Sequence, residues 1–460
     1  MPKASTHSFE LRRTGLSTPA IDKYAMVTIF VCAYATTIGP LISYSARPPY
    51  IDLLARVQNA EPDLVNRIFL PAMAAVSVVL AIRNYSRLGR WPPHMIWLLA
   101  YVAFAGASVL WAFKPETSFV RFVQQLMLLS SIVLPAMLAA RTSDLMRGMF
   151  LCFAAGAILN VFLGSDNRPC TVCLSDGYAG FLEGKNALGE FSGMTLLLAF
   201  REILYPGLRR VFGIIIVIVA SLLLLWSQSK TGFALALICP LLAGVILTVR
   251  KATRISPAII LFSAVACYQL VSSVTGFNLN KLSWHIYGNY TFSGRTDIWD
   301  FVFSEIARRP LLGWGYQSFW LVGSDAPSVV EASGWVRFMP NAHNGYYDTM
   351  LETGYVGYAL LIVFILATLH AIGRVADRDP GRAWFVLAVA LYVIIYNYLE
   401  SLWMKNNVIW VVFVILAVDI GRYWQPFSLT RAAYGSRSSR PGSSAPTPAL
   451  RTPTKPAALQ

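Results

Sequence analysis

The chain contains few of the residues that soluble enzymes use. Only 13% of its 460 residues are charged, with 23 acidic residues and five histidines, whereas charged residues make up roughly 25% of an average soluble domain. The sequence also lacks the GxSxG of serine hydrolases, a Walker phosphate loop, the HExxH of zinc proteases and a carboxylate-rich metal motif. These absences exclude the common hydrolase and nucleotide-binding designs, and they favour a reaction that uses no metal and no cofactor.

Apolar segments make up most of the chain, and 56% of its residues are hydrophobic. Apolar runs of about 18 to 22 residues recur along the whole length, and each is long enough to cross the hydrocarbon core of a bilayer. The sequence therefore predicts an all-α polytopic membrane protein with about 12 transmembrane helices. The predicted spans are 24–44, 67–83, 94–113, 118–140, 145–165, 186–204, 210–228, 231–249, 256–274, 354–373, 383–399 and 404–423.

The net charge of +15 fits membrane topology better than nucleic-acid binding, and no nucleic-acid partner is expected. Basic clusters follow alternate spans, at residues 3–23, 83–90, 141–147, 201–210, 250–254 and 374–382. This positive-inside pattern predicts cytoplasmic terminal segments, at 1–23 and 425–460, around a transmembrane domain at 24–424. The C-terminal segment is rich in Ser, Arg, Pro and Ala and is predicted to be a disordered basic tail. The same threading places one large loop, at about 274–353, outside the cytoplasm and before the last three helices.

The cysteines give no metal site. Two of them, Cys170 and Cys173, form a CxxC pair in the outward loop between the fifth and sixth spans, but a zinc site would need two more ligands. A disulfide and two free thiols both stay open for this pair. The other four lie in apolar runs and are expected to be packing residues: Cys32, Cys152, Cys239 and Cys267.

Four basic residues lie on the outward side, where no topological rule requires them. They are Lys185 in EGKNALGE, Lys230 in SQSKTGF, Arg295 in FSGRTDIW and Arg121 in SFVRFVQQ. A charged group in or near the bilayer is costly and indicates function; the alternative is a long side chain that reaches the lipid headgroups. Lys185 and Lys230 lie in tight turns whose backbone N–H groups can bind an anion. Arginine binds phosphate oxygens through its planar fork, so the four residues predict an anion site.

The large loop carries one histidine in a distinctive setting, His343 in PNAHNGYYD. Histidine is the side chain best suited to moving protons near neutral pH; a structural histidine is the alternative. Asp348 lies too far along the following helix to be an obvious partner that orients this ring. Glu352 and Glu400 are the outward carboxylates that could serve instead.

The segment after Arg295 is amphipathic and predicts a helix along the outer membrane interface. Ser293 or Thr296 can cap its start, and Pro310 ends it. Its apolar stripe is expected to pack or to anchor the helix rather than to bind sugar; the stripe consists of Ile298, Trp299, Val302, Phe303 and Ile306. The following PLLGWGYQSFW predicts either a sugar-stacking wall or a packed turn.

Three segments in this order, SGRTDIW, IARRPLLGWGYQSFW and NAHNGYYDTMLETGYVGYALL, resemble the O-antigen ligase and polymerase family of bacterial inner-membrane proteins. Within that family, the motif sequences most resemble those of the exopolysaccharide polymerases of the rhizobial type. The similarity is strongest over about 295–357 and extends more weakly to GKNALG, SQSKTG and NYLES. It implies about eleven to thirteen helices and glycosyl transfer in the periplasm, from a donor on an undecaprenyl diphosphate carrier.

The resemblance also implies roles for particular residues. His343 and Arg295 would be catalytic, and Arg295, Lys230, Lys185 and Arg121 would bind the diphosphate. Lys230 stands where many relatives have arginine, so it keeps the charge but loses the fork. The implied partners are lipid-linked oligosaccharides as donor and acceptor, the membrane, and other polysaccharide assembly and export proteins.

The prediction is therefore a polysaccharide polymerase, with three alternatives. A ligase that transfers glycan to lipid A–core would share the same motifs. A flippase or exporter for the same lipid-linked sugar would be expected to show internal repeats and charges at the bilayer midplane, and the sequence shows neither. A scaffold in an assembly complex would need neither Arg295 nor His343.

Overall fold

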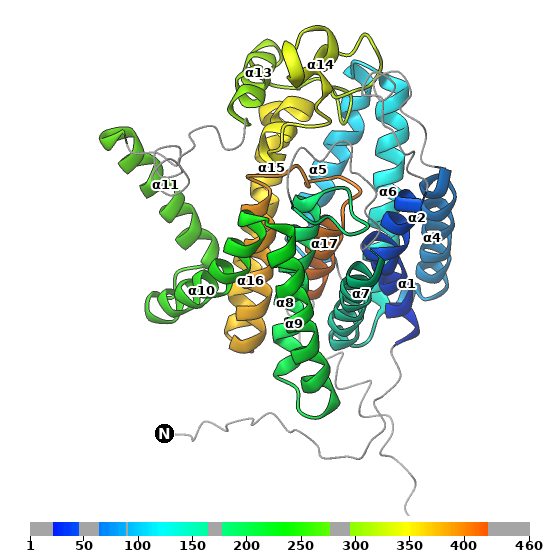
Figure 1. The fold of residues 1–460 in the computed structure, drawn as a ribbon, viewed down its shortest axis with the longest axis vertical. Coiled ribbons are helices and arrows are strands. Elements are labelled where there is room, and N and C mark those ends of the chain that lie inside the picture. Colours follow the sequence, from blue (N-terminus) through cyan, green and yellow to red (C-terminus); the bar gives the residue numbers. More distant parts are fainter. Residues whose placement is uncertain (1–21, 46–63, 89–90, 164–176, 277–294, 422–460) are drawn as a thin grey trace, which may run out of the picture.

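The computed structural model describes residues 22–45, 64–88, 91–163, 177–276 and 295–421. These residues form a bundle of helices joined by turns, and no strand occurs among them (Figure 1). The all-α prediction is confirmed. The predicted terminal segment 425–460 and the Cys170–Cys173 pair lie outside the described residues.

Each of the twelve predicted spans overlaps a helix or a run of helical segments. The first combines α1 (Lys23–Ala33), a π-helical turn η1 (Tyr34–Ile38) and α2 (Gly39–Ser45). The next are α4 (Leu64–Arg83), α5 (Met95–Ala107) with η3 (Ser108–Trp111), α6 (Pro115–Leu138) and α7 (Thr142–Leu163). They are followed by α8 (Lys185–Ile203), α9 (Leu208–Ser227), α10 (Lys230–Thr253) and α11 (Pro257–Thr275). The last three are α15 (Gly345–Ala376), α16 (Pro380–Tyr396) and α17 (Val408–Gly421).

Not every helix has the length and composition of a simple span. In the described part of the chain, eight helices are long and apolar enough to cross a membrane, and three more are shorter apolar helices. The twelve-span count and the loop arrangement therefore stay predictions. The helix α8 is the exception to both groups, because buried Glu190, Arg201 and Glu202 interrupt its apolar surface. It packs against α7, α9, α10 and α16, so protein rather than lipid surrounds these charges.

The segment 295–344 of the predicted loop folds on itself at one end of the bundle. Its helices α13 (Arg295–Arg308) and α14 (Pro327–Val330) and the turn η4 (Gly334–Phe338) lie together beyond the end of α15, at the top of the view (Figure 1). Four residues of the apolar stripe of α13 are buried in a small core of the loop with Phe319 and Trp320, whereas Phe303 is exposed; the four are Ile298, Trp299, Val302 and Ile306. Packing is thus the observed role of these four residues, and PLLGWGYQSFW forms a packed turn. The possible cap Ser293 lies outside the described residues.

The helix α15 is broken near its outer end. Gly354 has φ 65° and ψ −171° inside this helix, a conformation that favours glycine. A Cβ atom at Gly354 would lie 2.1 Å from the Leu311 carbonyl oxygen. The segment 310–315 runs alongside the break, where the Tyr355 N–H donates to the Pro310 carbonyl (2.8 Å) and the Gly315 N–H donates to the Glu352 carbonyl (2.8 Å).

Candidate active site

The amides around His343 hold its backbone in an unusual shape. His343 has φ 49°, in the left-handed region, which costs a non-glycine residue about 1 to 3 kcal/mol. The Asn341 side chain accepts a hydrogen bond from the His343 N–H (2.9 Å). The Asn344 side chain caps α15 by accepting from the N–H groups of Tyr346 (3.0 Å) and Tyr347 (3.2 Å). The side chains of Asn341 and Asn344 therefore fix the backbone on both sides of His343.

Glu400 joins the two residues that the sequence singled out as catalytic. Its Oε2 lies 2.9 Å from His343 Nδ1, and its Oε1 lies 2.8 Å from Arg295 Nη2. The Asn186 side chain also donates to Oε1 (3.1 Å). Glu400 was one of two carboxylates predicted to serve the histidine, and it is the one that the structure places there. The contact brings together the start of α8, the start of α13, the turn before α15 and the turn after α16.

The protonation of this group follows from its contacts. Burial raises the pKa of Glu400, but the bonds from His343, Arg295 and Asn186 lower it more, so the pKa lies below its ordinary value. An ionised carboxylate only accepts hydrogen bonds, so Nδ1 of His343 carries the proton that it donates to Glu400. The other ring nitrogen, Nε2, is then the one available to take a proton from a substrate.

Arg295 keeps an unused donor. Its side chain is 15% exposed, and its Nε atom is buried without a hydrogen-bond partner in the described part of the chain. A buried donor without a partner costs about 1 to 3 kcal/mol. One part of the guanidinium is therefore held by Glu400, while its Nε finds no acceptor among the described residues.

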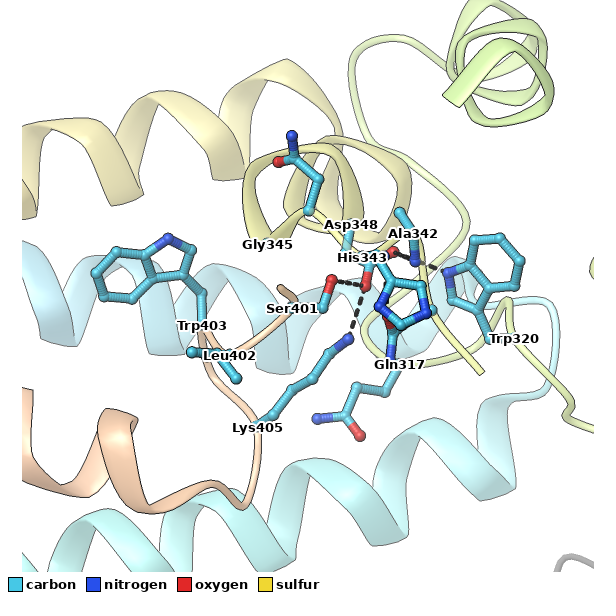
Figure 2. Close-up of polar contacts among 12 residues, drawn as sticks. Gln317, Trp320, Ala342, His343, Gly345, Asp348, Ser401, Leu402, Trp403 and Lys405 are labelled. Carbon is cyan, nitrogen blue, oxygen red and sulfur yellow. Dashed lines mark hydrogen bonds and ion pairs between the residues drawn. The ribbon is translucent and has the colours of Figure 1, made fainter. Parts of the chain in front are cut away.

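A second carboxylate, Asp348, fixes the backbone next to the histidine. Its Oδ1 accepts from Trp320 Nε1 (2.8 Å) and from the Ala342 N–H (3.1 Å). Its Oδ2 accepts from Ser401 Oγ (2.5 Å) and from Lys405 Nζ (2.7 Å). Figure 2 shows these four contacts converging on one carboxylate behind the imidazole ring. Asp348 therefore positions the turn that carries His343, although it does not touch the ring.

Lys405 is the site residue that sequence reasoning missed. The last span was predicted to start at 404, which would make Lys405 part of a membrane helix. The observed helix α17 begins only at Val408, because the Asn407 side chain caps it by accepting from the Ile409 N–H (2.7 Å). Lys405 lies instead in the outer turn, with its side chain 23% exposed. A lysine followed by two asparagines was the available signal for a helix start.

Lys185 and Lys230 begin neighbouring helices. Lys185 is the first residue of α8, partly exposed and without a polar partner among the residues described. Lys230 is the first residue of α10 and is exposed. The two helices approach closely, since a Cβ atom at Gly232 would lie 2.6 Å from the Gly189 carbonyl oxygen. Both lysines thus stand where helix dipoles already favour an anion.

Arg121 lies in a different group from the other three basic residues. Its Nη1 donates to the Gln317 carbonyl oxygen (2.6 Å), and Gln317 itself has φ 45°. The Gln317 side chain donates in turn to the Tyr316 hydroxyl (2.7 Å) and to the Met404 carbonyl (3.0 Å). Arg121 supports this strained turn, and it interacts electrostatically with the carboxylate of Glu352. The structure therefore does not bring it to Glu400.

These features describe a multi-pass helical membrane protein with a polar centre at one end of its bundle. Residues 215–362 match the O-Antigen ligase family, which is the family that the motifs of the sequence resemble. That range includes Arg295 and His343, whereas Lys185, Glu400 and Lys405 lie outside it.

Individual relatives agree with the family match. The exopolysaccharide production protein ExoQ of Rhizobium meliloti is 28% identical over 66% of this chain and 72% of its own length. A protein of Rickettsia bellii named "Putative polysaccharide ligase" is 27% identical over 26% of this chain, and the match covers 31% of that protein. A protein of the same name from Rickettsia felis is 25% identical over 25% of this chain and 30% of its own length.

Proposed function

We propose that this protein is a polysaccharide polymerase of exopolysaccharide biosynthesis in the bacterial inner membrane. It joins oligosaccharide repeat units that are carried on undecaprenyl diphosphate, at the outer face of that membrane, with both termini in the cytoplasm. The family match and the name of the Rhizobium relative support a role in polysaccharide assembly. One observation carries the enzymatic part of the proposal: a single ionised carboxylate, Glu400, binds both His343 and Arg295.

The reaction needs a base and a place for negative charge. A hydroxyl oxygen of the acceptor sugar attacks the anomeric carbon of the donor, and a new C–O bond forms as the bond from that carbon to the diphosphate oxygen breaks. Nε2 of His343 takes the hydroxyl proton. The carrier diphosphate leaves with the bonding electron pair, and the unused donor of Arg295 stabilises that charge, which is worth about 2.7 to 4 kcal/mol in comparable sites. A single displacement inverts the anomeric centre.

The remaining basic residues hold the carrier. Lys185 and Lys230, at two adjacent helix N-termini, bind the phosphate oxygens that Arg295 does not reach. Lys405 balances Asp348 and adds positive charge beside the histidine turn. Arg121 contributes to diphosphate binding through the 316–317 turn that it supports.

The test is complementation of a strain from which the gene has been deleted. The strain receives wild type, His343→Ala or the matched control His370→Ala, which changes an exposed histidine further along α15. Secreted polysaccharide and lipopolysaccharide are sized, and the protein is quantified in membranes. His343→Ala should abolish high-molecular-weight exopolysaccharide and leave single repeat units on the carrier, while His370→Ala restores the polymer. Normal polymer from His343→Ala at normal protein level removes this residue from the reaction.

The name shared by the Rickettsia relatives favours one other function, a polysaccharide ligase. The same strains separate the two functions. A ligase would lose long-chain lipopolysaccharide and accumulate polymer on the carrier, whereas a polymerase leaves lipopolysaccharide unchanged.

A further inference from the structure

A cavity lies beside the polar centre and is used by none of the steps above. Its volume is about 340 Å³, which is at the small end of the roughly 300–1000 Å³ of small-molecule sites. Its wall comes from the first helix, α4, α8 and the turn before α17. The π-helical turn η1 (Tyr34–Ile38) supplies part of this wall. Such π-helical turns are rare and occur frequently at functional sites.

The lining is polar without being basic. Hydroxyl and amide groups come from Thr36, Asn66, Asn406 and Asn407. Two glutamates also line the cavity, the exposed Glu183 and the almost fully buried Glu190. The described lining includes no lysine, arginine or histidine. Amides both donate and accept hydrogen bonds, which suits the hydroxyl groups of a sugar. The described lining would offer a diphosphate two glutamates and no basic residue, which disfavours its binding there.

The cavity and the basic residues lie on different sides of the same helix. Ala187 and Glu190 of α8 line the cavity, whereas Gly189 packs against the start of α10, where Lys230 stands. Asn186, between Lys185 and Ala187, donates to Glu400. Ala187 in the cavity wall therefore directly follows Asn186, which binds the carboxylate shared by His343 and Arg295.

We infer that this cavity binds an uncharged sugar residue of the acceptor glycan. The inference rests on the proposed function and adds its substrate geometry. The sugar attached to the diphosphate must stay with the basic residues, because the anion is bound there. The acceptor carries its reactive hydroxyl on a sugar far from its own diphosphate, and an amide-lined cavity without cations suits that end. The cavity wall then sets which acceptor sugar is used.

The test uses full-length protein in proteoliposomes. The donor is the carrier-linked repeat unit isolated from the deletion strain, and the acceptor probe is the free repeat-unit oligosaccharide released from that carrier by mild acid. Two variants change the cavity: Glu190→Gln keeps the shape of a buried side chain, and Asn406→Leu changes an exposed lining residue. The matched control is Glu116→Gln, an exposed acidic residue in the first turn of α6 and outside the cavity lining.

Each cavity variant should raise the KM for the free oligosaccharide at least tenfold, while kcat and the KM for the carrier-linked donor stay within twofold of wild type and of Glu116→Gln. An unchanged oligosaccharide KM in both variants overturns the inference even though the enzyme polymerises. A rise confined to the donor KM also overturns it, because the cavity would then hold donor sugar. Failure of the proposed function looks different: His343→Ala would extend the oligosaccharide as well as wild type does.

Discussion

Two carboxylates, the buried Glu202 and the partly buried Glu400, lie at the opposite ends of α8, and each contacts two basic groups. At the end of the helix, Glu202 is 2% exposed and pairs with Arg201 (2.8 Å) and Arg209 (2.6 Å). At the start, Asn186 reaches Glu400, which pairs with Arg295 and His343. The residue types and the distances are alike, so proximity of charges does not by itself distinguish a structural cluster from a functional one.

The two clusters differ in whether their basic side chains have hydrogen-bond donors without a partner. Arg201 also donates to the Tyr205 hydroxyl (3.1 Å), and the guanidinium of Arg209 lies 3.9 Å from the centre of the Tyr205 ring. Within the described chain, no buried side-chain nitrogen or oxygen of that cluster lacks a hydrogen bond. Arg295, by contrast, buries an Nε without a partner. Among the described residues, the Glu202 cluster has all its buried hydrogen bonds, whereas the Glu400 cluster keeps one buried donor without a partner.

The largest expected effect falls on the Glu202 cluster. Glu202→Gln leaves the buried Arg201 and the partly buried Arg209 without their carboxylate. Breaking a buried pair costs about 3 to 5 kcal/mol of stability. Thermal unfolding in detergent, followed by tryptophan fluorescence, should show a large fall in the midpoint. The activity per folded molecule should stay at the wild-type level, and a selective loss of activity at normal stability would contradict the comparison.

The next effect falls on the Glu400 cluster. In the proposed mechanism Arg295 stabilises the leaving diphosphate, so Arg295→Ala should lower the polymerisation rate about 100- to 1000-fold. Initial rates on carrier-linked units measure this. The unfolding midpoint should change little, because His343 and Asn186 still bind Glu400. Arg209→Ala is the matched control, and it should lower stability while the rate per folded molecule is kept.

A smaller effect is expected for Lys185→Gln. This lysine is partly exposed and has no polar partner among the described residues, so its removal should cost little stability. One exposed charge contact to a phosphate is worth about 1 kcal/mol or less, so the KM for the carrier-linked donor should rise about three- to fivefold. The rise should shrink at high salt because screening weakens the contact that is lost. A donor KM that is unchanged at low salt would remove Lys185 from the diphosphate site.

The smallest expected effect is the dependence of the unfolding midpoint on pH in the acid range. The pKa of Glu400 is lowered in the folded protein, so its ionised form adds stability above the ordinary glutamate pKa of about 4.3. That stability is lost as the pH falls through the lowered folded value. The difference in unfolding midpoint between wild type and Glu400→Gln should thus be constant above about pH 5 and shrink below about pH 4.3. Asp325→Asn is the control: its pair with Lys114 is solvent-exposed, so it should show little difference at any pH.

Much of this architecture could be predicted from the sequence because it follows from local patterns. Apolar runs located the helices, and the helix over Arg295–Arg308 was recognised from its periodicity and from Pro310. Arg295 and His343 were chosen by residue type and setting, and their common contact with Glu400 agrees with that choice. The count of membrane crossings did not follow, since α8 is surrounded by protein and its composition cannot reveal this.

The rest depended on contacts between distant residues. Glu400 lies 105 residues from Arg295 and 57 from His343 along the chain, so only the folded bundle shows that it serves both. Asp348 was set aside because it cannot reach the ring from its helix. It acts on the histidine turn through the Ala342 N–H instead, and a backbone contact of this kind leaves no pattern of residue types. Lys405 was missed because the last helix was predicted to begin before it, whereas the Asn407 cap starts that helix after it.

The break in α15 has a consequence for how the external loop and the membrane depend on each other. A broken helix exposes N–H and C=O groups that hydrocarbon cannot satisfy. Here the segment 310–315 supplies hydrogen-bond partners at the break. The carbonyl groups of Pro310 and Leu311 accept from the N–H groups of Tyr355 and Val356. The N–H groups of Trp314 and Gly315 donate to the carbonyl groups of Leu351 and Glu352. The loop that presents the reactive groups therefore also insulates the backbone of a spanning helix. Deleting that part of the loop would leave peptide groups of α15 without hydrogen-bond partners in lipid. Such a deletion should therefore destabilise the helix at its break.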